Sequence, residues 1–172
     1  MRVLLVEDDA DESERVRRLL TGQPDACFDP AAARTLAEAL ARARANPCDA
    51  ILLDLSLPDS RGADGLRRLA LAVPRAPIVV LADLYDEPAA LEALRHGAQD
   101  YLLKGAGDAA QLRRSIRYAV ERKAFENLLA ERAHFDPLSG LANRALFENR
   151  LSHALAQAGR NRRRVALMFI DL

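Results

Sequence analysis

The fold is decided by the segment Ile51-Leu52-Leu53-Asp54-Leu55-Ser56-Leu57-Pro58, at positions 51–58. It opens with an aliphatic run that does not alternate with polar residues, which is typical of a strand buried on both faces of a parallel sheet. The run ends on a carboxylate, Asp54, and Pro58 begins a turn-rich stretch. The segment therefore predicts an inner strand with an acidic side chain at its carboxyl end.

Similar apolar runs lie on both sides of this segment and alternate with amphipathic runs of helical spacing. Strands are predicted at residues 2–6, 26–29, 50–53, 78–81 and 100–103, and helices at 11–20, 32–45, 66–71 and 88–95. Strands and helices that alternate through short loops form right-handed crossovers. The sequence therefore predicts an α/β fold with a parallel sheet covered on both faces, in which ligands bind beyond the carboxyl ends of the strands.

Acidic residues and one lysine stand at three of these carboxyl ends. Glu7 and Asp8 follow the first strand, Asp54 ends the third, and Lys104 follows the fifth. Carboxylates brought together repel one another unless a cation such as Mg²⁺, which takes about six oxygen ligands, neutralises them. Together with the lysine, they suit phosphoryl transfer to a carboxylate. A simpler interpretation, in which the first acids only cap the next helix, accounts for Asp9 but not for the three strand ends together.

Three segments resemble the signature segments of response-regulator receiver domains. They are Leu4-Leu5-Val6-Glu7-Asp8-Asp9, Ile51-Leu52-Leu53-Asp54-Leu55-Ser56-Leu57-Pro58 and Gly97-Ala98-Gln99-Asp100-Tyr101-Leu102-Leu103-Lys104. The resemblance covers residues 1–122 and implies a flavodoxin-like, doubly wound sheet of five parallel strands in the order 2-1-3-4-5. It also implies that a sensor histidine kinase or a phosphotransfer protein is the partner that supplies the phosphoryl group.

The resemblance further implies a role for each residue of the acidic site. Asp54 would be the phosphoacceptor, and Asp8 and Asp54 would bind Mg²⁺ together with the backbone carbonyl of Ser56. Glu7 would help to hold the metal through water. Lys104 would pair with the phosphoryl group. The implied function is that of a two-component response regulator.

Two positions depart from the family pattern, and a third is ambiguous. Ala82 stands where family members carry Thr or Ser, whose hydroxyl hydrogen-bonds the phosphoryl group, and Gly105 follows the lysine where proline is usual. Tyr101 would be the aromatic that changes rotamer on activation, although an ordinary packed strand aromatic explains it equally well. Ala82 favours an alternative function, that of a pseudo-receiver that is not phosphorylated and serves as a dimerisation or interaction module.

A long helix is predicted to follow the receiver-like part, at residues 108–134. Residues 111–134 contain neither proline nor glycine, and their apolar positions recur every fourth residue. We expect the early part to pack on the sheet and the later part to pair with a helix of a second copy, which would give a homodimer. The alternative is a terminal helix that folds back on its own domain.

Residues 135–172 resemble the start of a GGDEF domain, the diguanylate cyclase that makes cyclic di-GMP from GTP. The opening motif is Asp136-Pro137-Leu138-Ser139-Gly140-Leu141-Ala142-Asn143-Arg144, a helix is predicted at 144–158, and a strand at 165–172 holds Asp171, whose counterpart in the family binds Mg²⁺. The GTP-binding Gly-Gly-(Asp/Glu)-Glu-Phe loop is not reached. We therefore expect an incomplete second domain that is not itself a cyclase, from a parent that is one.

The overall composition bears on the remaining questions of partners, cysteine state and location. Basic and acidic side chains number 25 each, so the formal net charge is zero, and nothing favours nucleic acid as a partner. The basic run at 160–164 lacks interleaved aromatics and is interpreted as a solvated loop.

Cys27 and Cys48 lack metal-ligand spacing and are expected to be buried free thiols. No apolar run is long enough for a membrane span or a signal peptide. We expect a cytoplasmic protein.

Overall fold

The structure is a computed structural model that describes residues 1–22, 27–83, 87–105, 107–136, 138–161, 163–168 and 170. The chain divides into two compact units, Met1–Phe125 and Glu126–Leu172. Each unit is described by itself.

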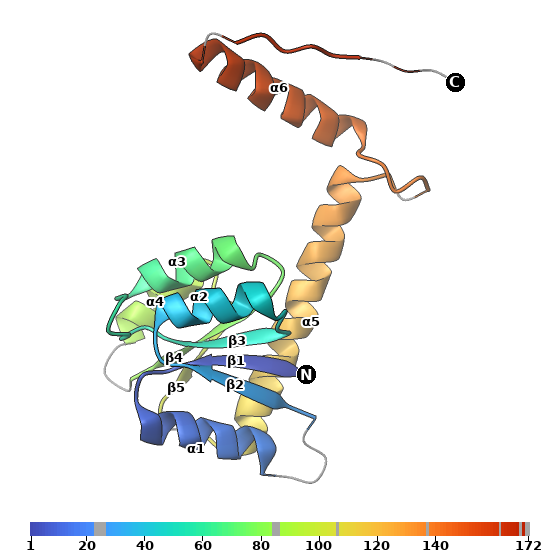
Figure 1. The fold of residues 1–172 in the computed structure, drawn as a ribbon. Coiled ribbons are helices and arrows are strands. Elements are labelled where there is room, and N and C mark those ends of the chain that lie inside the picture. The colour runs from blue at the N-terminus through green and yellow to red at the C-terminus, as the bar shows by residue number, and fades with distance from the viewer. Residues whose placement is uncertain are drawn as a thin grey trace. The chain divides into compact units, whose positions relative to one another are not determined.

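The first unit is built on a five-stranded sheet (Figure 1). The strands are β1 (Arg2–Val6), β2 (Asp29–Ala33), β3 (Ala50–Asp54), β4 (Ile78–Ala82) and β5 (Asp100–Leu103). The helices are α1 (Ala10–Thr21), α2 (Leu36–Ala45), α3 (Ala63–Ala72), α4 (Glu87–Arg95) and α5 (Ala109–His134), of which residues 109–125 belong to this unit. All strand pairs are parallel and the order is β2-β1-β3-β4-β5. The flavodoxin-like α/β fold and its strand order are therefore confirmed.

Two hydrophobic cores lie on the two faces of this sheet. One face packs on α2, α3 and α4, and the other on α1 and α5 (Figure 1). Along β1, Leu4 and Val6 belong to the first core, whereas Val3 and Leu5 belong to the second. Because both faces are buried, the inner strands have continuous apolar runs, residues 3–6 in β1, 50–53 in β3 and 78–82 in β4, which is why their sequences do not alternate.

The second strand and second helix lie later in the chain than predicted. The sequence pointed to a strand at 26–29 and a helix from 32, but β2 spans Asp29–Ala33 and α2 begins at Leu36. The β2 sequence Asp-Pro-Ala-Ala-Ala has little strand propensity. It nevertheless pairs in register with β1, and as an edge strand it tolerates Pro30. Thr35 then caps α2, because its hydroxyl accepts a hydrogen bond from Glu38 N at 3.1 Å.

The second unit contains a turn and the helix α6 (Arg144–Arg160), which begins where predicted and is capped by the Asn143 side chain on Leu146 N at 3.0 Å. The predicted strand at 165–172 is wrong for the residues described there, 165–168 and 170, none of which lies in a strand. An extended segment needs a neighbouring strand to satisfy its backbone groups, and none of the described strands pairs with this one. Asp171 lies outside the described residues.

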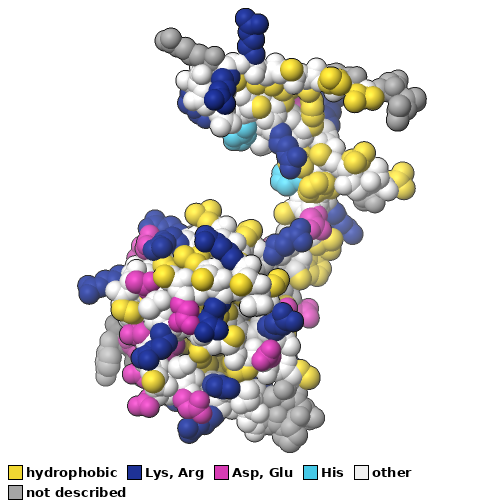
Figure 2. Space-filling view, viewed as in Figure 1, with side chains coloured by type: hydrophobic (Ala, Val, Ile, Leu, Met, Phe, Trp, Pro, Cys, Tyr) yellow, Lys and Arg dark blue, Asp and Glu magenta, His cyan; other side chains and the backbone are white. Residues whose placement is uncertain are grey.

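The surface agrees with the balanced composition. Acidic and basic side chains are interspersed over the visible face of the first unit (Figure 2). Both cysteines are free, but the expectation of burial is wrong for Cys27, which is exposed, while Cys48 is half-buried. Within the described ranges, none of the helices combines the length and the apolar character that crossing a membrane would need.

The first turns of α5 are expected to contribute strongly to the stability of the first unit. Ile116 is fully buried in the core shared with α1, whereas Tyr118 on the same helix is 63% exposed. We expect Ile116→Ala to lower the free energy of unfolding by roughly 2–5 kcal/mol, because it removes buried methylene groups and leaves a cavity. Tyr118→Ala serves as the control in urea unfolding and should change little. Equal losses in both variants would contradict this packing.

Candidate functional site

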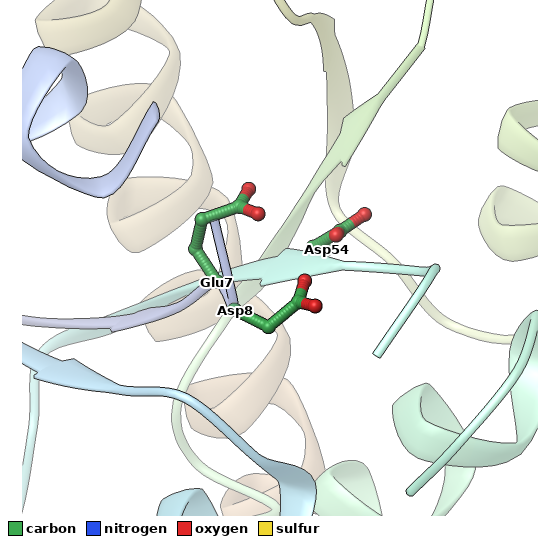
Figure 3. Close-up of side chains that lie close together, drawn as sticks. All are labelled: Glu7, Asp8 and Asp54. Carbon is green, nitrogen blue, oxygen red and sulfur yellow. The ribbon is translucent and has the colours of Figure 1, made fainter. Parts of the chain in front are cut away.

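Parallel pairing brings the carboxyl ends of β1, β3, β4 and β5 to one edge of the sheet. Val6 pairs with Leu53 across β1 and β3, so the next residues, Glu7 and Asp54, are neighbours at that edge. On the other side, Ala82 ends β4, and its carbonyl accepts a hydrogen bond from Lys104 N at 2.8 Å. The acidic residues at the ends of β1 and β3 approach one another with their carboxyl groups (Figure 3).

Lys104 joins the two buried carboxylates of the site. Its Nζ lies 2.8 Å from Glu7 Oε2 and 3.0 Å from Asp54 Oδ2. Glu7 is 1% exposed and Asp54 4%. Backbone N–H groups hold the other carboxylate oxygens: Asp9 N donates to Glu7 Oε1 at 3.2 Å, and Ser56 N donates to Asp54 Oδ1 at 3.1 Å. Both side chains are thus held from two directions.

A third carboxylate completes an oxygen-rich cluster. Glu7, Asp8 and Asp54 each offer one oxygen, and these three oxygens lie within 4.8 Å of one another. The contact from Lys104 to Glu7 Oε2 has the distance of an ion pair, yet among the described residues this buried oxygen receives no hydrogen bond. Three carboxylates against one ammonium leave an excess of negative charge. Such a donor set fits a hard divalent cation with oxygen ligands.

Burial makes Glu7 an unusual carboxyl group. Desolvation raises its pKa from 4.5 to about 7, and the negative charge of Asp54 adds to the rise, against the opposing effect of Lys104. The pKa of Lys104 is raised as well. Burial alone would lower it, but its contacts with Glu7 and Asp54 outweigh that effect. The lysine therefore stays charged while it neutralises part of the cluster.

The pKa of Glu7 has a consequence for the stability of the metal-free protein. A carboxyl group whose pKa is higher in the folded state binds its proton more tightly there, so its contribution favours folding at low pH. That contribution is expected to be lost as the pH rises from about 4.5 to about 7. In urea unfolding across this window, Glu7→Gln should flatten the pH dependence, while the exposed control Glu14→Gln should not. Identical pH dependence in wild type and Glu7→Gln would contradict the assignment.

The remaining residues singled out in the sequence lie around this cluster. Asp8 is half-buried beside it, and Ser56 is exposed on the loop after β3. Ala82 is buried, 4% exposed, and brings no hydroxyl to the edge. Tyr101 is half-buried on β5 and packs against the core beneath α2, α3 and α4. Its part in activation stays a prediction, as do the roles of the other site residues.

Two further residues at this edge were not found from the sequence. The Asp59 carboxylate accepts hydrogen bonds from Leu36 N at 2.8 Å and Ala37 N at 2.9 Å, so it caps α2 from the loop after β3. The Arg34 side chain donates from Nη2 to the carbonyl oxygen of Asp8 at 3.0 Å. Asp59 lies in a turn-rich segment, which is a weak sequence signal for a helix cap. No feature of the sequence around Arg34 indicated its contact with Asp8.

Comparison with protein families gives two matches. The family model of the response regulator receiver domain matches residues 3–117, and that of the diguanylate cyclase GGDEF domain matches residues 133–172. Together they associate the chain with two-component signalling and with the diguanylate cyclases.

Curated relatives agree with the first match. The KDP operon transcriptional regulatory protein KdpE of Escherichia coli is 35% identical over 120 residues, which are 70% of this chain and 51% of KdpE. The regulatory protein LuxO of Vibrio cholerae is 42% identical over 74 residues, 43% of this chain and 16% of LuxO. The chain thus spans about half of KdpE and a smaller part of LuxO.

Solved structures share the same fold. The receiver domain of NtrX from Brucella abortus is 25% identical with a TM-score of 0.62, and the match covers 69% of this chain and 98% of that one. A receiver domain protein from Clostridium thermocellum, 24% identical with a TM-score of 0.64 over 73% of this chain and 98% of that one, supports the fold alone. With the acidic cluster at the carboxyl edge of a 2-1-3-4-5 sheet, these matches show that the chain belongs to the family of response regulator receiver domains, followed by a GGDEF region.

Proposed function

We propose that Asp54 accepts a phosphoryl group from a phosphohistidine of a sensor histidine kinase or phosphotransfer protein. One Asp54 carboxylate oxygen forms the new P–O bond while the P–N bond to the imidazole breaks, and the imidazole takes up a proton. The observation that carries this proposal is the arrangement of Asp54, which Lys104 and Ser56 N hold in place beside two further carboxylates. Positioning and charge neutralisation are what this reaction most needs from a protein.

The same cluster supports a role for Mg²⁺. Asp8 and Asp54 would hold the ion together with the carbonyl of Ser56, and Glu7 would contribute through water. When bound, the ion neutralises charge that develops on the transferring phosphoryl oxygens. Lys104, now between Glu7 and Asp54, would pair with a phosphoryl oxygen after transfer. The excess of carboxylates over the single ammonium is the feature that supports a divalent cation here.

The proposal is tested by incubating the protein with a small phosphodonor, such as acetyl phosphate, with and without Mg²⁺. We expect one phosphoryl group per chain, and only in the presence of the ion. A protein that stays unlabelled at millimolar Mg²⁺ would refute the proposal.

The second candidate, a pseudo-receiver that serves as an interaction module, has one specific feature in its favour. Ala82 places a methyl group at the end of β4, where the family's hydroxyl would contact the phosphoryl group. This change concerns the response to phosphorylation rather than the acceptor or the metal ligands. An NMR titration discriminates between the candidates, because a pseudo-receiver site would leave the amide signals around Asp8 and Asp54 unchanged at millimolar Mg²⁺.

For the output, we propose that phosphorylation regulates a diguanylate cyclase through the helix at 108–134, with the receiver at 1–122 and the GGDEF part at 135–172. The GGDEF match supports the kind of output. Homodimerisation along the later part of α5 is supported by three apolar side chains that are exposed there, Phe125 at 68%, Leu128 at 43% and Leu129 at 61%. Such a stripe at helical spacing favours a partner helix. Sedimentation velocity tests the dimer.

A further inference from the structure

We propose that Arg34 is a positioning residue that fixes Asp8 for cation binding, a role that rests on the proposed function of the acidic site. Its Nη2 donates to the carbonyl oxygen of Asp8 at 3.0 Å, although the two residues are 26 positions apart in the chain. Arg34 directly follows β2, and Asp8 lies just beyond β1. Since these strands are neighbours in the sheet, the arginine reaches across their carboxyl ends.

Asp8 needs such support more than the other two carboxylates do. Glu7 and Asp54 each accept a backbone N–H bond and an ion pair with Lys104. Among the residues that the structure describes, the Asp8 carboxylate has no comparable contact, and it is half-buried rather than buried. Asp8 also lies in the short connection between β1 and α1, where the strand ladder no longer holds the backbone. The bond from Arg34 therefore restrains the main chain from which the Asp8 carboxylate extends.

Arg34 is anchored through its main chain, while its side chain is exposed. Its backbone N donates to Glu38 Oε2 at 2.9 Å, and the other oxygen of Glu38 is bound by Arg42 through Nε at 2.9 Å and Nη2 at 2.8 Å. The backbone bond from Arg34 and the pair with Arg42 hold the pKa of Glu38 below its ordinary value, so this anchor is charged near neutral pH. This main-chain anchor fixes the point from which the Arg34 side chain reaches the Asp8 carbonyl.

The direction in which Mg²⁺ affinity changes when Arg34 is removed distinguishes a positioning role from a purely electrostatic one. Arg34 carries a positive charge close to a site that is proposed to hold a cation, so removal of that charge alone would tighten cation binding. Loss of the support for Asp8 would weaken it. Removal of outer-shell partners of metal ligands typically reduces affinity about 10–100-fold. Because this bond reaches the Asp8 main chain rather than its carboxylate, we expect about the lower limit, a tenfold loss of Mg²⁺ affinity.

Arg61 provides a matched control. It is exposed, and it lines a depression together with Asp8 and Ser56. No hydrogen bond joins it to Asp8 among the described residues. Arg61→Ala therefore removes the same charge from the same surroundings without removing a bond to Asp8, and its Mg²⁺ affinity should be unchanged or higher. Arg34→Lys keeps the positive charge on a shorter side chain and should recover only part of the Mg²⁺ affinity that Arg34→Ala loses.

The experiment is a Mg²⁺ titration of wild type, Arg34→Ala, Arg34→Lys and Arg61→Ala, followed by two-dimensional NMR of the backbone amides. We expect Arg34→Ala to bind Mg²⁺ about tenfold more weakly, and its rate of labelling by acetyl phosphate to return close to wild type at saturating Mg²⁺. In the metal-free protein, the amide signals of Asp8 and its neighbours should shift or broaden in Arg34→Ala but not in Arg61→Ala. Thermal unfolding of each variant shows that the fold is kept.

The outcomes separate this inference from the function on which it rests. Arg34→Ala binding Mg²⁺ as tightly as wild type, or more tightly, would overturn the positioning role and leave the phosphoacceptor proposal standing. Unchanged Asp8 signals in metal-free Arg34→Ala would overturn it as well. A wild-type protein that ignores Mg²⁺ would instead overturn the proposed metal site, and the positioning role with it.

Discussion

Asp54→Asn is expected to abolish labelling by a small phosphodonor. The amide that replaces the carboxylate has no anionic oxygen to attack phosphorus, while its Oδ1 can still accept the hydrogen bond from Ser56 N, now 3.1 Å. The fold should therefore be kept, and the variant should remain at the background of the assay. Because one negative charge leaves a buried cluster, its thermal stability without metal should be equal to or above that of wild type.

The control for this result is Asp64→Asn, which removes an exposed acid at the start of α3. This control should be labelled like wild type, since among the described residues the ion pairs of Asp64 are with Arg67 and Arg68 of its own helix, at 3.8 and 3.7 Å. If Asp54→Asn were labelled as quickly as Asp64→Asn, the acceptor would lie elsewhere.

Asp8→Asn is expected to slow labelling roughly 100-fold or more at Mg²⁺ concentrations that do not saturate the variant. It removes one of the two carboxylates that are proposed to hold the ion directly. The charge stabilisation at stake is several kcal/mol, with about 1.4 kcal/mol for each factor of ten. Much higher Mg²⁺ should restore part of the rate. This partial rescue distinguishes a metal ligand from the acceptor, whose loss no concentration of Mg²⁺ should repair.

Asp11→Asn is the matched control, because Asp11 is an exposed acid that lies close to Asp8 in the chain, on α1. Its labelling rate and its Mg²⁺ dependence should follow those of wild type. A rate for Asp8→Asn that also matched wild type across the Mg²⁺ series would remove Asp8 from the proposed metal site.

The fold and the centre of the site were largely predictable because both depend on where strands end. Runs without alternation, such as Ile78 to Leu81, indicate strands buried on both faces, and their carboxyl ends meet at one edge. Those strand ends alone predicted that Glu7, Asp54 and Lys104 come together. In the structure, the Lys104 Nζ lies 2.8 Å from a Glu7 carboxylate oxygen and 3.0 Å from one of Asp54.

The features that the sequence did not predict depend on contacts between residues that are distant in the chain. β2 was misplaced because its Asp-Pro-Ala-Ala-Ala sequence becomes a strand only through pairing with β1. Arg34 and Asp59 were missed because the reach of one side chain to a distant backbone leaves no periodic trace. The predicted strand at 165–172 had the right apolar pattern, but apolar pattern without a neighbouring strand does not make a sheet.

The contribution of Ala82 can be judged more sharply with the site in view. Its carbonyl holds the backbone of Lys104 at 2.8 Å, which any residue at this position could do. Its methyl group, in contrast, would offer no hydrogen-bond donor to a phosphoryl group on Asp54. We therefore regard the acceptor chemistry and the metal ligands as independent of this substitution, whereas the conformational response after phosphorylation would have to proceed without a hydroxyl at the end of β4.

The most direct test of the central claim is to locate the phosphoryl group chemically. After reaction with acetyl phosphate and Mg²⁺, borohydride reduction converts an aspartyl phosphate to homoserine, which peptide mass spectrometry assigns to one position. We predict homoserine at position 54 and at no other aspartate. Homoserine at another position, or none in a protein whose fold and Mg²⁺ binding are intact, would contradict the account.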